Sequence, residues 1–194
     1  VYEGGIRVPM IVRWPAGLPG GRRCDELIHF TDWFPTLLAA AGLEPPQALA
    51  LDGRSVLPVL RGGRHSAGPR RFWQWNRYTP LVTCNAAMRE GPWKLVRPSI
   101  REAFVVAESD MAMDIALKYR PEGITDIDRG PEPPRQVPPP PPPELYNIER
   151  DPLEQANLAA LEPERTARML CALETWFEAM DAERRRNLKH SDPA

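Results

Sequence analysis

Cysteine and histidine are scarce in this sequence, with three of each among 194 residues. The three cysteines are widely separated and show no Cys-x-x-Cys spacing, which argues against a zinc site or a redox pair. We predict three reduced, partly buried thiols; the alternative is one internal disulfide plus a free thiol. The histidines, His29, His65 and His190, are scattered along the chain and give no support for a histidine metal site or a catalytic triad. We therefore assign no metal ligand and no catalytic residue within this chain.

Two further absences limit what the chain can bind. No stretch of about 18 apolar residues is present, so the sequence predicts no membrane span. The 25 basic and 26 acidic residues give a net charge of −1, which provides no long-range field toward nucleic acid or an anionic membrane surface. A small substrate that is recognised locally, or a protein partner, fits this balance better than nucleic acid or a membrane does.

Proline, in contrast, is abundant: the 24 prolines are more than twice the average share of about 5%. Six are consecutive, Pro138–Pro143, and this run must be an extended polyproline II segment. It ends an insertion of residues 98–143, in which residues 104–119 are predicted to contain a helix. We interpret the proline run as a stiff spacer. The alternative is a partner site for an SH3- or WW-type groove.

Residues 1–69 have the pattern of a strand followed by a helix. The short apolar run Val8–Trp14 lies between glycine and proline and predicts a buried strand. Apolar residues then recur along residues 33–41 at the spacing of one helical face, and Gly42 is placed to end that helix. This order is typical of an α/β sandwich, in which a helix covers one face of a mostly parallel sheet. We expect residues 1–69 to be the edge of a larger sheet.

Residues 70–194 have a different pattern, that of a small antiparallel sheet with a terminal helix. Four short extended runs are predicted as strands, at residues 72–75, 84–89, 93–97 and 145–148. Glu90-Gly91-Pro92 between the second and third runs is a hairpin signal. A helix is predicted from residue 163 to residue 188, with an apolar stripe that includes Met169 and Leu173. The predicted fold is thus the C-terminal portion of an α/β sandwich plus a four-stranded antiparallel sheet and a terminal helix.

Five sequence blocks resemble, in the expected order, the C-terminal part of type I sulfatases of the alkaline phosphatase superfamily. The blocks are Glu3–Pro9 with Trp14–Gly17, Asp32–Leu38 with Gly42, Leu51–Ser55, Arg89–Leu95, and Glu144–Asn147 followed by Asp151–Glu154 and Asn157–Leu158. The resemblance covers most of this chain but only part of a whole sulfatase. It implies an alkaline-phosphatase-like fold and hydrolysis of a sulfate monoester, with a small sulfated sugar or aryl sulfate as the substrate.

The resemblance also implies that the catalytic groups lie outside this chain. Such enzymes use a formylglycine, formed in a Cys-x-Pro-x-Arg or Ser-x-Pro-x-Arg motif, and a calcium ion, and neither the motif nor an Asp-Asp pair occurs here. We expect this chain to be inactive alone, to bind no cofactor, and to pack on an N-terminal part of the same protein. A periplasmic or secreted location is implied by the family. The alternatives are a phosphodiesterase or phosphonate hydrolase of the same superfamily, or a non-enzymatic interaction module.

Two short stretches are the candidate site residues. Trp75, Asn76 and Arg77 combine aromatic, amide and guanidinium groups where a strand ends, a mixture suited to a sugar or aryl sulfate. The alternative is ordinary packing by the aromatic residues of this stretch. We predict that Trp75, Asn76 and Arg77 bind substrate.

The second stretch is the opening motif, which the resemblance places next to an active site. We predict structural roles for its members. Gly4 and Gly5 form a sharp turn and not a helix, Glu3 accepts hydrogen bonds from backbone or arginine, and Arg7 pairs with an internal carboxylate. Lys94 and Arg89, which flank the hairpin, are expected to be structural ion-pair partners.

Overall fold

The computed structural model describes residues 1–64, 70–125 and 131–190, with side chains described as far as residue 187. His65 and the side chain of His190 lie outside this description. The chain divides into two compact units, each described separately below. The sheet unit comprises Val1–Ile6 and Phe72–Ala194, and the other unit comprises Arg7–Arg71. None of the helices in the described ranges is long and apolar enough to cross a membrane.

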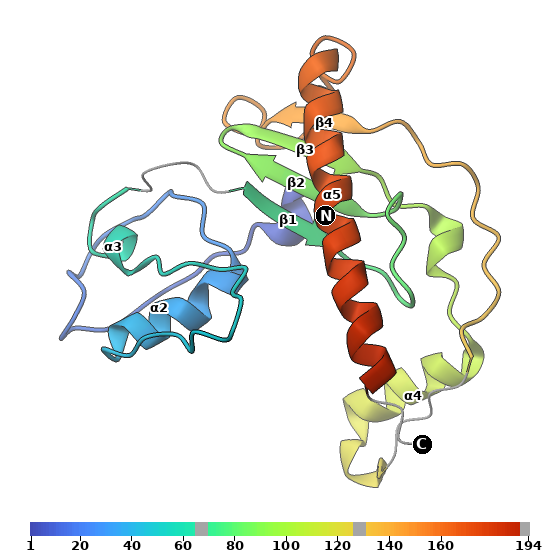
Figure 1. Ribbon diagram of the computed structural model, residues 1–194, viewed down its shortest axis with the longest axis horizontal. Coiled ribbons are helices and arrows are strands. Elements are labelled where there is room, and N and C mark those ends of the chain that lie inside the picture. The colour runs from blue at the N-terminus through green and yellow to red at the C-terminus, as the bar shows by residue number, and fades with distance from the viewer. Residues whose placement is uncertain (65–69, 126–130, 191–194) are drawn as a thin grey trace. The chain divides into compact units, whose positions relative to one another are not determined.

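The sheet contains four strands in the order β1-β2-β3-β4 (Figure 1). They are β1 (Arg70–Gln74), β2 (Ala86–Glu90), β3 (Trp93–Arg97) and β4 (Glu144–Asn147). The β2–β3 and β3–β4 pairs are antiparallel. Gly91 takes a φ of +57° as the first central residue of the two-residue hairpin that joins β2 to β3, which is the position where a type II′ turn needs glycine. The predicted four-stranded sheet is confirmed.

One face of the sheet packs against the long helix α5 (Pro163–His190), which crosses all four strands in Figure 1. The buried cluster at this face consists of Ala86, Met88, Leu95, Leu145, Met169 and Leu173. Trp176 of α5 stacks on Phe72 of β1, with ring centroids 5.0 Å apart. The predicted terminal helix and its apolar stripe are confirmed. Side chains alternate between the two faces along β2, β3 and β4, so one face of the sheet is apolar and α5 covers it.

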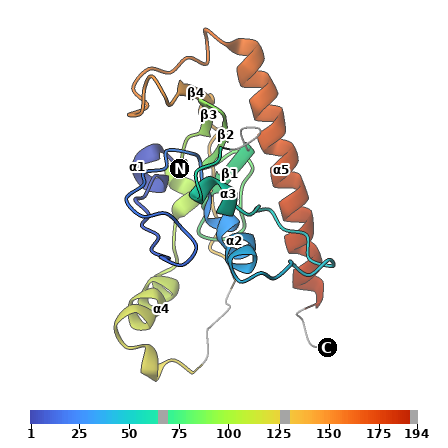
Figure 2. The ribbon, with the colours of Figure 1, turned by 90° about the vertical axis from the view of Figure 1, so that its left-hand side faces the viewer.

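The opposite face of the sheet carries α1 (Glu3–Ile6), which Figure 2 shows across the sheet from α5. The prediction that the glycine pair forms a turn rather than a helix is wrong, since Gly4 and Gly5 lie within one helical turn. The Tyr2 carbonyl accepts hydrogen bonds from the amides of Gly5 and Ile6, at 2.9 and 3.2 Å. Neither glycine has a positive φ, so their flexibility permits the turn of helix without an unusual backbone conformation.

The insertion between β3 and β4 contains three short helices and, at residues 131–143, a segment called the strap below. The helices are η2 (Arg101–Phe104), α4 (Glu108–Tyr119) and η3 (Pro121–Gly123). The helix predicted within residues 104–119 is therefore confirmed as α4, although α4 has no buried residue. Residues 131–143 lead to β4 without helix or strand. Val137 packs against the cluster of Cys84, Ile100 and Ala103, and most of the following prolines are exposed.

In the Arg7–Arg71 unit, the regular structure is helical: η1 (Phe30–Asp32), α2 (Trp33–Ala40) and α3 (Leu57–Leu60). The prediction of a helix that stops at a glycine is confirmed, because Gly42 follows α2 with a φ of +71°. Its expected apolar face is not buried as a whole. Phe34 and Leu37 are exposed, and the residues of α2 that are buried are Pro35 and Thr36.

The predicted buried strand Val8–Trp14 is wrong for this chain. These residues form neither a strand nor a helix, and Val8 and Ile11 are 75% and 93% exposed. A strand is stable only when a neighbouring strand pairs with its N–H and C=O groups. None of the described residues of the Arg7–Arg71 unit forms a strand before Arg70, so Val8–Trp14 has no such neighbour in its unit.

Candidate functional site

The opening motif is fixed by a buried lysine. Lys94 of β3 is fully buried, and its Nζ lies 3.0 Å from Glu3 Oε1 and donates a hydrogen bond to it. Nζ also lies 2.8 Å from Glu154 Oε1, as an ion pair without hydrogen-bond alignment. Glu154 Oε2 accepts a hydrogen bond from the Glu3 amide at 2.6 Å. Lys94 is therefore a structural ion-pair partner, as expected. Glu3 was expected to accept hydrogen bonds from backbone or arginine, and its partner is this lysine instead.

Arg89 differs from its expected role, and the expected partner of Arg7 is not found among the described residues. Arg89 makes no ion pair with any described residue, and its Nε donates to the Gly91 carbonyl at 3.1 Å, because the side chain folds back along the hairpin. Arg7 is exposed and has no carboxylate partner among the described residues. The residue lies just after α1, at the start of the exposed segment, and its pairing with an internal carboxylate stays a prediction.

The Asp-Pro-Leu-Glu block presents Glu154 to Lys94. Backbone hydrogen bonds, the first from Ala156 at 2.8 Å, hold the pKa of Asp151 below its usual value. The turn that Asp151 stabilises leaves Glu154 at a φ of +55°, a conformation uncommon for residues other than glycine. Asn157 Oδ1 then accepts from the amide of Leu145 at 3.0 Å and joins this turn to β4. The last sequence block is therefore a structural clasp around the opening motif.

A second buried charge organises the Arg7–Arg71 unit. Asp32 is fully buried, and its Oδ1 lies 2.6 Å from Arg71 Nη2, which donates to it. The same oxygen accepts from the Arg54 amide at 3.0 Å, while Oδ2 accepts from the His29 amide at 2.8 Å. Burial and the nearby Arg71 lower the pKa of His29, which caps η1. Asp32 thus connects three separate segments of the unit.

The Leu51–Ser55 block passes close to the start of α2, and Gly53 makes this possible. A Cβ atom at Gly53 would lie 1.9 Å from the Thr31 carbonyl oxygen, well inside van der Waals contact. Beyond it, Val56 donates from its amide to Thr36 Oγ1 at 2.9 Å. The second and third sequence blocks are therefore explained by packing, and they contribute no reactive group.

The predicted substrate residues lie on a loop after β1 in the sheet unit. Trp75 is 53% exposed, and its ring stacks on Phe104 of the insertion, with centroids 5.2 Å apart and planes 12° apart. The Arg77 guanidinium lies 5.4 Å from the Trp75 ring centroid. The side-chain N and O of Asn76 are both buried and have no hydrogen-bond partner among the described residues. The structure thus brings an aromatic surface, a cation and an amide together on one loop.

The insertion holds the rest of this loop through Tyr78. The Tyr78 hydroxyl donates to Asp110 Oδ2 of α4 at 2.5 Å and accepts from the Ala107 amide at 3.1 Å. The hydrogen bond to Asp110 raises the pKa of Tyr78. Tyr78 is therefore attached to the first turn of α4 by two hydrogen bonds.

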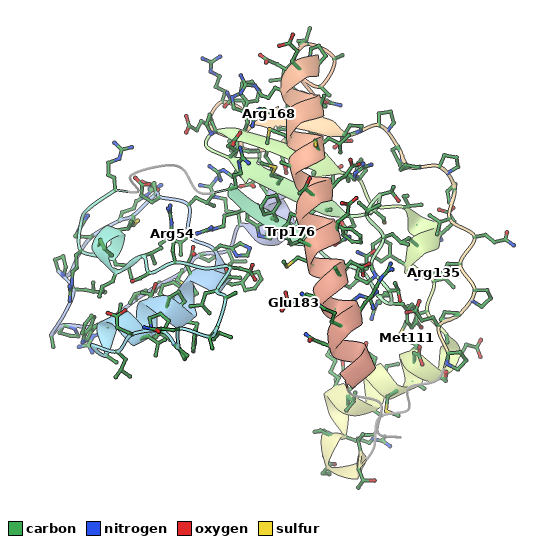
Figure 3. The ribbon with its side chains drawn as sticks, in the orientation of Figure 1. Arg54, Met111, Arg135, Arg168, Trp176 and Glu183 are labelled. Atoms are coloured by element: carbon green, nitrogen blue, oxygen red, sulfur yellow. The ribbon has the colours of Figure 1, made fainter. Side chains whose placement is uncertain are left out.

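Thr79 is attached to the strap that follows α4. Its amide and hydroxyl both donate to Glu132 Oε1, at 2.7 and 2.5 Å. Arg135 Nη2 lies 2.9 Å from Glu132 Oε2 and donates to the Thr79 carbonyl at 3.2 Å. Partial burial raises the pKa of Glu132, but the hydrogen bonds from Thr79 and the charge of Arg135 outweigh it and lower the pKa. Figure 3 shows Arg135 on this strap and Met111 on α4.

Sequence reasoning found the loop but missed the residues that hold it. Asp110, Glu132 and Arg135 lie 30 or more positions away from Trp75 and show no motif spacing, so the sequence contains no local signal for them. Within the described ranges, no three histidine, cysteine or acidic residues come close enough to hold a metal ion. The residues present therefore do not fit a calcium site. The three cysteines are free thiols, as predicted, but Cys24 and Cys171 are exposed and not partly buried.

Comparison with known proteins gives the family. The sequence family described as N-sulphoglucosamine sulphohydrolase, C-terminal, matches residues 1–106, more than half of the chain. The ulvan-active sulfatase of Formosa agariphila is 30% identical over 163 residues, covering 82% of this chain and 30% of that protein. The steryl-sulfatase of Mus musculus is 30% identical over 185 residues, covering 95% of this chain and 27% of that protein.

Solved structures agree with the fold. A Bacteroides thetaiotaomicron structure from work on glycosaminoglycan metabolism has a TM-score of 0.55 and 24% identity, over 93% of this chain and 30% of that one. A structure in complex with its substrate D-glucosamine-2-N,6-O-disulfate has a TM-score of 0.50 and 19% identity, over 94% and 29%. This chain spans about 30% of the length of the first relatives it matches. It belongs to the N-sulphoglucosamine sulphohydrolase C-terminal family and corresponds to the C-terminal part of a type I sulfatase.

Proposed function

We propose that this chain is part of a longer enzyme, called the parent protein below, that hydrolyses sulfate monoesters of sugars or aryl alcohols. The match of the sulfatase C-terminal family to residues 1–106 carries this proposal. The relatives named above are sulfatases, which favours sulfate esters over the phosphodiesters and phosphonates that the superfamily also includes. The glucosamine disulfate bound by a protein of the same fold makes a sulfated amino sugar the first substrate to test.

The chemical step belongs to residues outside this chain. Hydrolysis at sulfur needs a nucleophile and cationic groups that balance the charge on the sulfate oxygens. In the parent protein, a formylglycine and a calcium ion would supply these. The acidic residues described here are engaged in structural contacts or exposed, and none forms a cluster suited to calcium. The contribution of this chain is therefore to bind and orient the substrate.

The loop of Trp75, Asn76 and Arg77 is the proposed contact with substrate. The exposed face of Trp75 suits the C–H face of a sugar ring, and Phe104 behind it keeps the indole in place. Arg77 has a planar guanidinium next to this ring, a geometry that pairs well with a sulfate or carboxylate group. Asn76 has a buried amide without a partner among the described residues, and a sugar hydroxyl would satisfy it.

Residues 8–12 are the proposed contact with the rest of the parent protein. Val8, Met10, Ile11 and Val12 are apolar yet exposed. An exposed apolar segment with unpaired backbone groups is suited to join a sheet edge. We propose that this segment becomes a strand when it packs on the N-terminal part of the same protein, and that the Glu3–Ile6 helix is placed by Lys94 at the start of this segment.

The reaction is tested by assaying the purified parent protein on D-glucosamine 6-sulfate, an aryl sulfate, a phosphodiester and a phosphonate monoester. We expect hydrolysis of a sulfate ester with the highest kcat/KM, and no hydrolysis of any of them by residues 1–194 alone. A higher kcat/KM for the phosphodiester or phosphonate would reassign the reaction. Hydrolysis by residues 1–194 would show that a catalytic group lies in this chain.

The loop is tested by Arg77→Ala in the parent protein. Loss of a charged hydrogen bond to substrate, at about 1.5 to 3 kcal/mol, corresponds to a rise in KM on the order of tenfold to a hundredfold for a sulfated sugar. Arg101→Ala is the matched control, because Arg101 is also exposed in the sheet unit and lies on η2. Unchanged kinetics for Arg77→Ala would mean that this loop is ordinary surface.

A further inference from the structure

Several hydrogen bonds join the described part of the insertion of residues 98–143 to one short loop. Asp110, Glu132 and Arg135 belong to the insertion, and all three bond to Tyr78 or Thr79. Phe104, at its beginning, stacks on Trp75. These four contacts come from η2, α4 and the strap, which are separate elements of the insertion.

Part of the insertion packs on the sheet unit, because Ile100, Ala103 and Val137 share an apolar cluster with Cys84, but α4 does not pack in this way. α4 buries none of its residues, and Met111 and Ile115 on it are exposed. Helices of globular domains normally gain their stability by burying an apolar face, and α4 does not. What α4 and the strap share is that each places a carboxylate on the Tyr78–Thr79 segment, one through Asp110 and the other through Glu132. Both α4 and the strap are thus attached to this segment by a carboxylate.

We propose that the insertion is the specificity element of the parent protein, with Asp110 and Glu132 as positioning residues that hold the Trp75–Thr79 loop for a sulfated saccharide. This inference rests on the proposed function, since it assigns the loop a substrate. The saccharide stacks on Trp75, and Arg77 binds its anionic group. Because the loop is clamped at Tyr78 and Thr79, the indole and guanidinium are ordered before binding, which lowers the entropy cost of binding.

A small aryl sulfate and a sulfated saccharide should respond differently to loss of the clamp. An aryl sulfate has its reacting group next to its only ring, so it has less need of a remote platform. A saccharide with further sugar units extends away from the reacting sulfate and gains from remote contacts. Removing the clamp should therefore raise KM for the saccharide and leave KM for the aryl sulfate and both kcat values nearly unchanged.

The test uses Asp110→Ala and Glu132→Ala in the full-length parent protein. Asp114→Ala is the control for the first, because Asp114 lies on α4 one turn later and is exposed. Glu122→Ala is the control for the second, because Glu122 is an exposed acid of the same insertion. We expect KM for a sulfated disaccharide to rise on the order of tenfold in each variant, as for the loss of a charged hydrogen bond, and to be unchanged in the controls.

Amide hydrogen exchange gives a readout that does not depend on catalysis. The Thr79 amide donates to Glu132, and the Ala107 amide donates to the Tyr78 hydroxyl. Glu132→Ala should speed exchange at Thr79, and Asp110→Ala should speed exchange at Ala107, with no change in the controls. The double variant Tyr78→Phe/Asp110→Ala should raise KM for the disaccharide by less than the product of the two single effects. The reason is that each substitution removes the same hydrogen bond, the one between Tyr78 and Asp110.

The outcomes separate this inference from the proposed function. Unchanged exchange at Thr79 and Ala107 would overturn the positioning role, whatever the parent protein hydrolyses. Faster exchange with unchanged KM for the disaccharide, in a parent that hydrolyses sulfate esters, would overturn the specificity role. A parent that hydrolyses no sulfate ester would overturn the proposed function, and the specificity role with it. Equal rises in KM for the disaccharide and the aryl sulfate would also overturn specificity.

Discussion

Each of the two units contains a fully buried charged side chain, Lys94 in one and Asp32 in the other, but the surroundings of the two charges differ. In the sheet unit, Lys94 lies on one face of a sheet whose other face packs on α5 through a closed apolar cluster. In the Arg7–Arg71 unit, Asp32 connects the segments at His29, Arg54 and Arg71. Apolar residues such as Ile11 and Leu37 remain exposed there. The first unit has a larger apolar core and a polar clasp, and the second combines its polar network with a few buried apolar residues, Val56, Leu57 and Val59.

This difference indicates how stable each unit is by itself. A sheet covered by a helix buries its apolar residues within one unit, and burial supplies most folding free energy. A polar network gives specific geometry but little net stabilisation, because the same groups lose their bonds to water. We therefore expect the sheet unit to be the more stable part, and the Arg7–Arg71 unit to depend on surface supplied from outside it.

The largest expected effect is that of Lys94→Met. The substitution leaves Glu3 and Glu154 buried next to each other without a cation. Breaking a buried ion pair by removing one partner costs about 3 to 5 kcal/mol. Urea unfolding of the 194-residue chain, followed by the circular dichroism of α5, measures this loss. Lys118→Met is the control, because Lys118 is exposed on α4. A loss below about 1 kcal/mol would mean that the two carboxylates can reach solvent or take up protons at little cost.

Asp32→Asn tests the other buried charge and has a more local effect. Arg71 then loses its ion pair, at a cost of about 3 kcal/mol, the lower end for a buried pair, because the amide oxygen still accepts a hydrogen bond. Exchange of the Arg54 and Val56 amides should speed up, while exchange within β2 and β3 stays the same. Asp25→Asn is the control, since the Asp25 pair with Arg23 is exposed. Faster exchange in the sheet as well would mean that the two units unfold together.

Gly53→Ala should destabilise the Arg7–Arg71 unit by about 1 to 3 kcal/mol. The new Cβ would overlap the Thr31 carbonyl, and the backbone of two segments would have to move apart, as for an overpacked core. The hydrogen exchange of the Val56 amide again gives the measurement. Gly20→Ala provides the control, because no atom lies within 4 Å of the position of its Cβ. Equal exchange rates in the two variants would show that the 51–55 segment moves freely away from α2.

The same contrast explains which parts of the fold could be predicted from the sequence. Strand alternation, the glycine turn at Gly91 and the stripe of α5 are local patterns that are satisfied within the sheet unit, so the sheet and helix were predicted correctly. Val8–Trp14 has the composition of a buried strand, and the prediction failed because its pairing partner is not among the described residues of its unit. A strand pattern indicates what a segment can do when paired and does not supply the pair.

The candidate site shows a similar division. The Trp75–Arg77 mixture was visible in the sequence because three suitable residue types are adjacent. Its supports at Asp110, Glu132 and Arg135 were not visible, because they come from an insertion whose register on the loop depends on tertiary packing. The Lys94 role was predicted as an ion pair, but its second partner, Glu154, has a positive φ that the sequence does not indicate.

The smallest expected effect in this chain is that of Ile11→Thr, and it tests whether the exposed segment is part of a larger sheet. Ile11 is 93% exposed, so in residues 1–194 the substitution should change the unfolding free energy by less than about 0.5 kcal/mol. If residues 8–12 become a buried strand in the parent protein, the same change should cost about 1 to 3 kcal/mol there, since a hydroxyl replaces a buried ethyl group. Ile148→Thr is the matched control, because Ile148 is 4% exposed and should show its cost in both contexts. A small effect of Ile11→Thr in both contexts would leave the segment exposed in the parent protein, and the Arg7–Arg71 unit would then be stabilised by the Asp32 network without a larger sheet.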